Sequence, residues 1–270
     1  MSVVDTLTTS TEPGVTQDHD LRVPRDAAVR LSGVSQVFDR SGPPVLDGVD
    51  LTVGAGEFVC LLGASGCGKS TMLNLVAGLT QPTSGRVEVT AQRPALMFQE
   101  PALLPWLTAA GNVELALRAR GVGKAERRAE ADRLLTVVNL AGQGGKRVHE
   151  LSGGMRQRVA LARSLAQDSS VLLMDEPFAA LDAITRDVLH LELVRVWSER
   201  QLAVVFVTHN VREAVRLGQR VVLMGSRPGR VVREWDVDLP HPRNIESLEV
   251  SVLASEITEE LHREISRHGS

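Results

Sequence analysis

The sequence contains no tyrosine and only two cysteines, and aromatic residues make up 3% of its 270 positions. Cys60 lies in an apolar run and Cys67 in a glycine-rich segment, which argues against a disulfide framework and favours two free intracellular thiols. No apolar run approaches the roughly 20 residues that a membrane-spanning helix needs. These absences predict a protein that is soluble on its own and stays in the cytoplasm.

The sequence also lacks the basic, aromatic-rich character of nucleic-acid-binding proteins. Its formal net charge is −3, so we expect no nucleic-acid partner. Residues 1–25 have no periodicity and no basic start followed by an apolar run, so we expect a disordered tail rather than a signal peptide. Apart from His209, the histidines show no metal-ligand spacing.

The length and the 43% hydrophobic content are enough for one substantial α/β core with one small inserted lobe. Residues 124–133 mix both charges at helical spacing, which indicates a solvated helix face. Between Ile245 and Ile265, apolar residues recur every four positions and predict an amphipathic C-terminal helix. Core packing is its expected role, and a regulatory or partner surface is the alternative.

A glycine-rich segment lies between an apolar run at 57–63, which predicts a strand, and a helical pattern that starts at Thr71. Its residues are Gly63, Ala64, Ser65, Gly66, Cys67, Gly68, Lys69 and Ser70. Glycines allow backbone N–H groups to surround a phosphate, Lys69 adds positive charge, and Ser70 offers a hydroxyl to Mg²⁺. The strand–loop–helix context therefore predicts a nucleotide-binding P-loop rather than a chance glycine turn.

An acidic pair follows the apolar run at 171–175. In a parallel sheet, catalytic groups gather at the carboxyl ends of strands. Asp175 is expected to hold Mg²⁺, and Glu176 to polarise the water that attacks the γ-phosphate. Taken alone, such a pair is more often a solvated turn or a helix N-terminus.

A second anion-binding helix end is predicted at Leu151–Arg163. Ser152, Gly153 and Gly154 precede a helical pattern, which leaves free N–H groups and the positive end of the helix dipole exposed. Because the chain already has a complete phosphate loop, this second helix end is explained by dimerisation around ATP.

Together these motifs resemble the ATP-binding subunit of an ABC transporter, from about Ala28 to the C-terminal region. The resemblance implies a P-loop NTPase core with a mostly parallel α/β sheet, an antiparallel β edge and an inserted helical lobe that carries the signature motif. Residues 26–270 would form this ATPase domain, with the helical lobe at about 100–165 and a C-terminal helical extension at about 240–270.

The resemblance also assigns roles to single residues. Ser152, Gly153, Gly154 and Gln157 belong to the signature that closes over the γ-phosphate held by a second copy. Gln99 contacts Mg²⁺ or the attacking water, and His209 contacts the γ-phosphate. Thr71 continues the phosphate loop, Asp182 crosses the dimer interface, and Phe38 stacks on adenine unless it is a half-buried strand residue. Asn210 stands where the family more often has aspartate, and Ala179 stands where it more often has serine or glycine.

Residues 98–108 are unusually apolar for a stretch beside a catalytic glutamine. They form a buried loop or, as in the family, the place where a helix of the transmembrane permease docks. In that case Leu104 and Trp106 are candidate contact residues.

Three segments resemble in sequence the nitrate, sulfonate and taurine importer branch of the family, namely residues 98–108, 226–230 and 237–243. Residues 86–97 are shorter than the hairpin usual there, which leaves the local strand count open. The branch implies ATP and Mg²⁺ as cofactors, a second copy and permease subunits as partners, indirectly an extracytoplasmic solute-binding protein, and a peripheral place on the cytoplasmic face of the membrane. The alternatives are a soluble ABC ATPase acting on DNA or ribosomes and a non-catalytic nucleotide-binding regulator.

Overall fold

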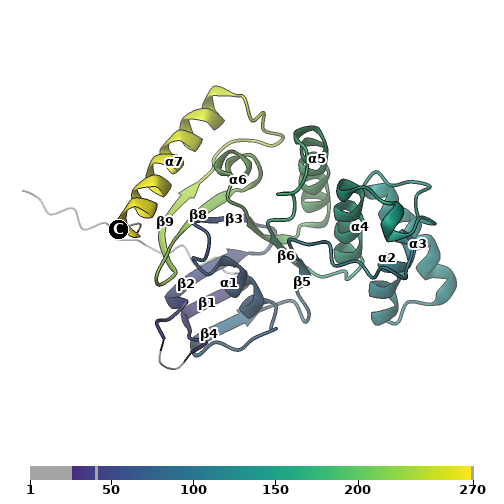
Figure 1. Ribbon diagram of the computed structural model, residues 1–270, viewed down its shortest axis with the longest axis horizontal. Coiled ribbons are helices and arrows are strands. Elements are labelled where there is room, and N and C mark those ends of the chain that lie inside the picture. The colour runs from purple at the N-terminus through teal and green to yellow at the C-terminus, as the bar shows by residue number, and fades with distance from the viewer. Residues whose placement is uncertain (1–25, 40–41, 269–270) are drawn as a thin grey trace, which may run out of the picture.

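The computed structural model describes residues 26–39 and 42–268, and a six-stranded sheet forms its centre (Figure 1). The strands lie in the order β5-β6-β7-β3-β8-β9, and all neighbours are parallel except β8 and β9. Their bounds are β3 (Phe58–Gly63), β5 (Ala95–Met97), β6 (Val171–Asp175), β7 (Ala203–Val207), β8 (Arg220–Gly225) and β9 (Arg230–Asp236). The strands expected from the apolar runs at 57–63 and 171–175 are thereby confirmed.

A separate antiparallel sheet of three strands packs against the first one. It has the order β2-β1-β4, with β1 (Ala27–Gln36), β2 (Leu46–Gly54) and β4 (Ser84–Val89). After β4 the chain passes through one short turn directly to β5. The shortened segment at 86–97 therefore contributes the end of one antiparallel strand and the start of the parallel part.

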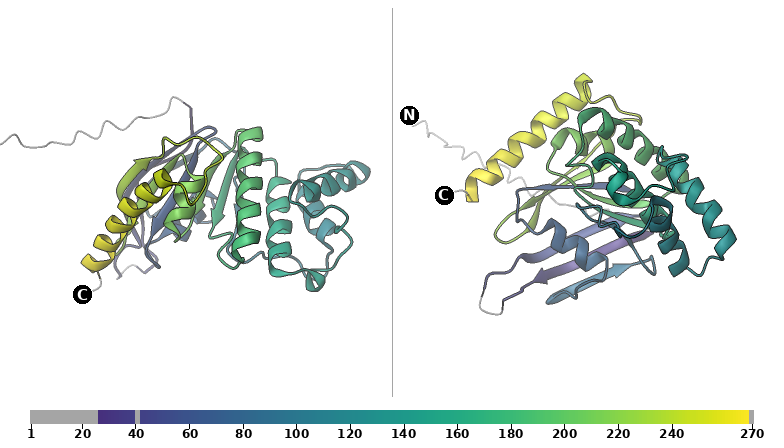
Figure 2. Two further views of the ribbon diagram at one scale, coloured as in Figure 1. Left: turned by 90° about the horizontal axis from the view of Figure 1, so that it is seen from above. Right: turned by 45° about the vertical axis from the view of Figure 1, so that its right-hand side comes forward.

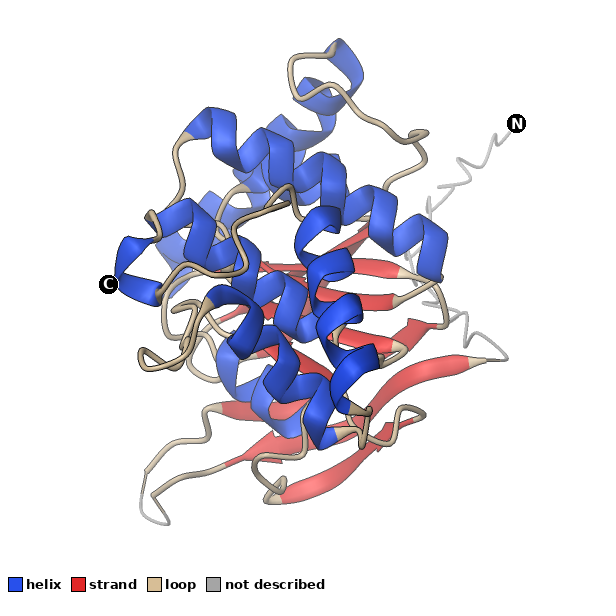
Figure 3. Ribbon diagram, turned by 90° about the vertical axis from the view of Figure 1, so that its right-hand side faces the viewer, coloured by secondary structure: helices blue, strands red, loops and turns tan. Residues whose placement is uncertain are grey.

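The helices cover the core and form the lobe. Helix α1 (Lys69–Val76) follows β3, while α5 (Ala183–Arg200), α6 (Val211–Leu217) and α7 (Leu248–His268) belong to the second half of the chain. The lobe holds α2 (Ala109–Ala119), α3 (Lys124–Val137), the short helix η1 (Val148–Glu150) and α4 (Gly153–Leu165). Figure 2 shows the lobe projecting from one side of the molecule and α7 on the opposite side. Figure 3 shows helices lying in front of the strands when the molecule is seen from the lobe.

The sheet is buried on both faces, as its continuous apolar runs require. Along β3, Phe58, Cys60 and Leu62 point into a core shared with the helices and the lobe. Val59 and Leu61 point the other way, into a core shared with α1 and the antiparallel sheet. A strand buried in this way places the loop that follows it on a rigid support.

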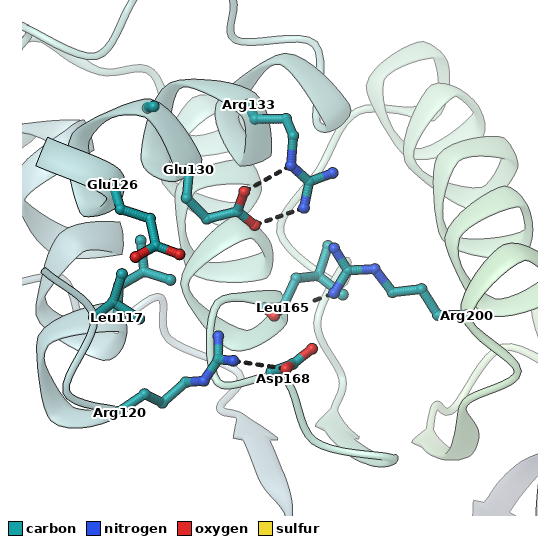
Figure 4. Close-up of a pocket in the computed structure, with 10 residues that line it drawn as sticks. Leu117, Arg120, Glu126, Glu130, Arg133, Leu165, Asp168 and Arg200 are labelled. Carbon is teal, nitrogen blue, oxygen red and sulfur yellow. Dashed lines mark hydrogen bonds and ion pairs between the residues drawn. The ribbon is translucent and has the colours of Figure 1, made fainter.

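A pocket of about 400 Å³ lies where α2, α3, α4 and α5 meet, and charged side chains line it (Figure 4). Arg120 contacts Asp168 at 2.6 Å, and Arg133 contacts Glu130 at 2.7 and 2.5 Å. Arg200 and Glu126 complete three basic and three acidic groups. Because these charges balance, the pocket offers no excess charge to a ligand, and the Arg120 pair fastens the lobe to the core.

Two helix boundaries differ from the sequence expectation. Helix α1 begins at Lys69 rather than Thr71, because Gly68 adopts the left-handed conformation that starts the helix within the loop. The C-terminal helix spans 248–268, and Ile257 is fully buried while Ile265 is 44% exposed, so the apolar face packs only in part. Within the described part of the chain, no helix is long and apolar enough to cross a membrane. The predicted tail at 1–25 lies outside the described residues.

Candidate functional site

The predicted site residues follow four neighbouring strands at one edge of the sheet. Gln99 follows β5, Asp175 and Glu176 stand at the end of β6, His209 follows β7, and the glycine-rich loop follows β3. Since these strands are parallel, their carboxyl ends lie along the same edge, where ligands bind in open α/β sheets. The structure thus aligns residues that are up to 146 positions apart, from Gly63 to His209.

The glycine-rich loop closes around the ammonium group of Lys69. This side chain is only 7% exposed, and its Nζ donates hydrogen bonds to the carbonyls of Gly63 (2.8 Å) and Ala64 (2.9 Å). Gly68 has φ +95°, and a Cβ there would lie 2.5 Å from the Leu46 side chain, so only glycine fits. No side chain caps α1, which leaves its N-terminal N–H groups free for an anion.

Glu176 and His209 form the one direct contact between predicted catalytic side chains. The Glu176 Oε2 lies 3.0 Å from the His209 Nδ1. Glu176 has φ +43°, an uncommon conformation for a residue with a side chain, and its N–H donates to the Val207 carbonyl at 3.0 Å. This conformation turns the carboxylate out of the line of β6 towards the loop that follows β7. Glu176 is 22% exposed and His209 66% exposed, so both can be reached by a ligand.

Three residues offer oxygen atoms of the kind that Mg²⁺ prefers. Asp175 is a half-buried carboxylate, whereas the Ser70 hydroxyl and the Gln99 amide lie on exposed residues. Mg²⁺ is usually held by one or two protein oxygens together with phosphate oxygens and water. The donor set at this edge fits that chemistry.

The signature residues begin helix α4 in the lobe. Ser152 is exposed and caps α4 by accepting a hydrogen bond from the Met155 N–H at 3.3 Å. Gly153 has open space around it, whereas a Cβ on Gly154 would lie 2.9 Å from Thr185 of α5. Helix α4 belongs to the lobe and α1 to the core, so the two predicted anion sites lie in different parts of the molecule (Figure 1).

The lobe holds the backbone of the Gln99 segment, which we define as residues 99–106. The contacts run from Gln157 to the Gln99 carbonyl (2.8 Å), from Arg163 to the Pro101 and Ala102 carbonyls (2.8 and 2.7 Å), between Asn112 and Leu104 (2.8 Å), and from Arg147 to the Trp106 carbonyl. Gln157 is 3% exposed, so its side chain is engaged in positioning Gln99. Trp106 is 66% exposed at the end of this fixed segment, which rules out a fully buried loop.

Asp182 and Phe38 are both exposed. Asp182 is exposed and caps α5, and the hydrogen bond from the Thr185 N–H lowers the pKa of its carboxyl. Phe38 lies beyond the end of β1 and is 64% exposed, which excludes the half-buried strand alternative. Arg186 was not among the predicted site residues, yet it donates to the carbonyls of Phe178 (3.3 Å) and Leu181 (2.7 Å) and so fixes the loop between Glu176 and Asp182.

The chain is similar to known proteins of one family. A family model described as ABC transporter matches residues 46–179. A taurine import ATP-binding protein of Mesorhizobium japonicum is 45% identical over 214 residues, which cover 76% of this chain and 83% of the relative. The chain belongs to the ABC transporter family. A nitrate import ATP-binding protein of Synechocystis sp. is 43% identical over 221 residues, covering 78% of this ABC ATPase and 83% of the relative.

Solved structures show the same fold. A bacterial ABC transporter cassette solved as a dimer has a TM-score of 0.71 at 32% identity and covers 78% of this chain and 100% of the cassette. The same cassette in a post-hydrolysis state with bound ADP and phosphate has a TM-score of 0.70. The ABC fold predicted from the motifs is confirmed, and this ABC ATPase binds and hydrolyses ATP.

Proposed function

We propose that this ABC ATPase powers the import of a small anion, working as a pair of identical subunits beneath a membrane permease. The alignment of Gln99, Glu176, His209 and the Lys69 loop along one sheet edge carries the proposal. The intact lysine, carboxylate and histidine favour a catalytic subunit over a nucleotide-binding regulator.

The residues at the sheet edge take separate roles in hydrolysis. The N–H groups of the phosphate loop and α1 bind the β- and γ-phosphates of ATP, and Lys69 turns from the Gly63 and Ala64 carbonyls to the phosphate oxygens. Glu176 orients the attacking water and accepts its proton, while His209 holds the Glu176 carboxylate and reaches the γ-phosphate. Gln99 completes the water site. Catalysis then rests on positioning and charge stabilisation.

Mg²⁺ would be held by Ser70, Asp175 and Gln99. When bound, it neutralises charge on the phosphate oxygens. The exposed Phe38 ring would stack on the adenine ring.

A second copy would complete each site. Ser152 and Gly153 are exposed at the positive end of α4, with no phosphate loop of their own chain beside them in the lobe. Facing subunits would bring these N–H groups to the γ-phosphate held by the partner, with the exposed Asp182 at the contact. The dimeric state of the similar bacterial cassette supports this arrangement.

The Gln99 segment would bind the permease. Its backbone is fixed by the lobe, so the exposed Trp106 ring is presented at little entropic cost to a partner. The ATPase would therefore sit peripherally on the cytoplasmic face of the membrane. The relatives named for taurine and nitrate import support a small anion as solute, delivered to the permease by an extracytoplasmic binding protein.

The test is capture of the tagged chain from native membranes in mild detergent, with its partners identified by mass spectrometry. We expect a polytopic permease with the wild type, and its loss with Trp106→Ala. Leu115→Ala removes a 41%-exposed apolar side chain elsewhere on the lobe and should leave the permease bound. Recovery of ribosomes or DNA-bound proteins in place of a permease would overturn the proposal in favour of a soluble ABC ATPase.

The purified complex then tests the solute. Sulfonates and nitrate are expected to stimulate its ATP hydrolysis when the binding protein is present. Stimulation by cationic or neutral solutes instead would contradict the anion assignment.

A further inference from the structure

Three buried polar side chains lie directly behind the contact between Glu176 and His209. They are His190 of α5, Thr208 at the end of β7 and Glu213 of α6, with exposures of 2%, 2% and 6%. A buried carboxylate is costly unless its oxygens are hydrogen-bonded, so its partners show what it holds. None of these three residues carries a role in the mechanism described above.

Glu213 binds both other members of this group. Its Oε1 lies 2.6 Å from the His190 Nε2, and its Oε2 accepts a short hydrogen bond from the Thr208 hydroxyl. Arg216 lies 3.4 Å from the His190 Nδ1, and because a guanidinium can only donate, this nitrogen is the acceptor. The Nε2 of His190 therefore carries the hydrogen and donates a hydrogen bond to the Glu213 Oε1.

The Thr208 hydroxyl closes the turn that presents His209. Its oxygen accepts a hydrogen bond from the Asn210 N–H at 3.0 Å, while the Asn210 side chain accepts one from the Glu213 N–H at 3.3 Å. The Thr208 N–H donates to the Leu61 carbonyl of β3 at 3.1 Å. His209 is thus flanked on both sides by residues that Glu213 binds, directly or through Thr208.

His190 connects this turn to the other side of the site. Its ring packs against Phe178 with 5.6 Å between ring centroids, two residues beyond Glu176. His190 also lies on α5, the helix capped by Asp182. One buried pair therefore touches the segments that carry Glu176, Asp182 and His209.

We propose that Glu213, held by His190, is a positioning residue for ATP hydrolysis, because it binds the Thr208 hydroxyl and so fixes the turn that brings His209 to Glu176. The inference rests on the proposed function of Glu176 and His209. Glu213 acts through the turn and does not touch the nucleotide, so its loss affects turnover and not ATP binding.

The sharpest test removes the Thr208 hydroxyl at constant shape. Thr208→Val keeps the side-chain volume but loses both hydrogen bonds of the oxygen, whereas Thr208→Ser keeps the oxygen and loses a methyl group. In steady-state assays of the full chain, we expect Thr208→Val to lower kcat at least tenfold with KM for ATP unchanged within twofold. Thr208→Ser is expected to stay within threefold of the wild type. A larger loss for serine than for valine would show a packing role and overturn the proposal.

Glu213 itself is tested by a matched pair of variants. Glu213→Gln keeps an oxygen that can accept from the His190 Nε2–H and gains an N–H that can donate to the Thr208 oxygen, so it should restore most of the kcat lost in Glu213→Ala. The control is Asp187→Asn, which removes the charge of the exposed ion pair between Asp187 and Arg216 and so weakens a contact between the same two helices without touching Thr208. If it lowers kcat as much as Glu213→Ala, the effect belongs to helix packing and the proposal fails. A wild type without ATPase activity would count against the proposed function instead.

Discussion

At the scale of single residues, the backbone of Glu176 is as informative as its side chain. A left-handed conformation costs about 1 kcal/mol or more for a residue with a Cβ, and it persists where the surrounding structure enforces it. Here the hydrogen bond from its N–H to Val207 and the contact with His209 hold it in place. The strained backbone therefore belongs to the residue whose carboxylate the proposed mechanism needs most.

Replacing Glu176 with Gln keeps the size and removes the proton acceptor. We expect ATP binding to remain near the wild-type level while turnover falls about a hundredfold or more, the usual contribution of a general base. Fluorescent-nucleotide titration and a phosphate-release assay measure the two quantities. Lys69→Ala is the comparison, because loss of its charge should weaken binding itself; turnover near wild type in the glutamine variant would refute the assignment.

Some residue roles could not be predicted from the sequence, because they depend on contacts between residues far apart in the chain. Gln157 was predicted to belong to the signature site, but its bond to the Gln99 carbonyl joins residues 58 positions apart and leaves no local pattern. The roles of His190 and Glu213 were missed for the same reason, since they meet only when α5 and α6 pack. By contrast, the phosphate loop, Asp175 and Glu176 could be predicted because each follows an apolar strand within a few residues.

At the scale of elements, the segment 237–243 gains a physical role. Arg243 is 6% exposed and donates to the carbonyls of Leu239, Val215, Gly218 and Val237. Burial lowers the pKa of its guanidinium to about 10. Val215 and Gly218 lie at the end of α6, so Arg243 caps the helix that begins beside His209. In the sequence, this segment was only a marker of the family branch.

Arg243→Lys is therefore expected to destabilise the fold. Lysine has three donors at one point and cannot reproduce the planar arrangement of guanidinium bonds, which leaves buried carbonyls unsatisfied. A loss of about 2 to 3 kcal/mol of unfolding free energy is expected, measured by urea denaturation. Arg267→Lys, at an exposed position on α7, is the matched control. Equal midpoints for both variants would refute the capping role.

His241 makes the same helix end sensitive to pH. Burial, aided by the charge of Arg243, lowers the pKa of this imidazole below its ordinary value near 6.5. As the pH falls through that value, the unfolded chain takes up a proton before the folded one does, so stability is lost on acidification. Thermal melts from pH 7.5 to 5.5 should show a shallower decline for His241→Gln than for the wild type. Identical declines would contradict this account.

At the scale of the whole molecule, the proposed pair should form only when ATP is bound and not hydrolysed. With Glu176→Gln and ATP, light scattering after gel filtration is expected to show a doubled mass, since hydrolysis no longer reopens the pair. Lys69→Ala treated in the same way should remain at the mass of one chain. An unchanged mass for the glutamine variant at high protein concentration would argue against pairing around ATP.

The contacts of the Gln99 segment connect the exposed Trp106 with the signature helix α4. Gln157 and Arg163 lie on α4, the helix that begins after Ser152, and both donate hydrogen bonds to backbone carbonyls within the Gln99 segment, which ends at Trp106. Trp106 and Ser152 are therefore connected through the same helix, α4. A shift of α4 would carry both the Gln99 segment and the Ser152 end of the helix with it, so a subunit docked at Trp106 and a nucleotide facing Ser152 would be coupled through this one helix.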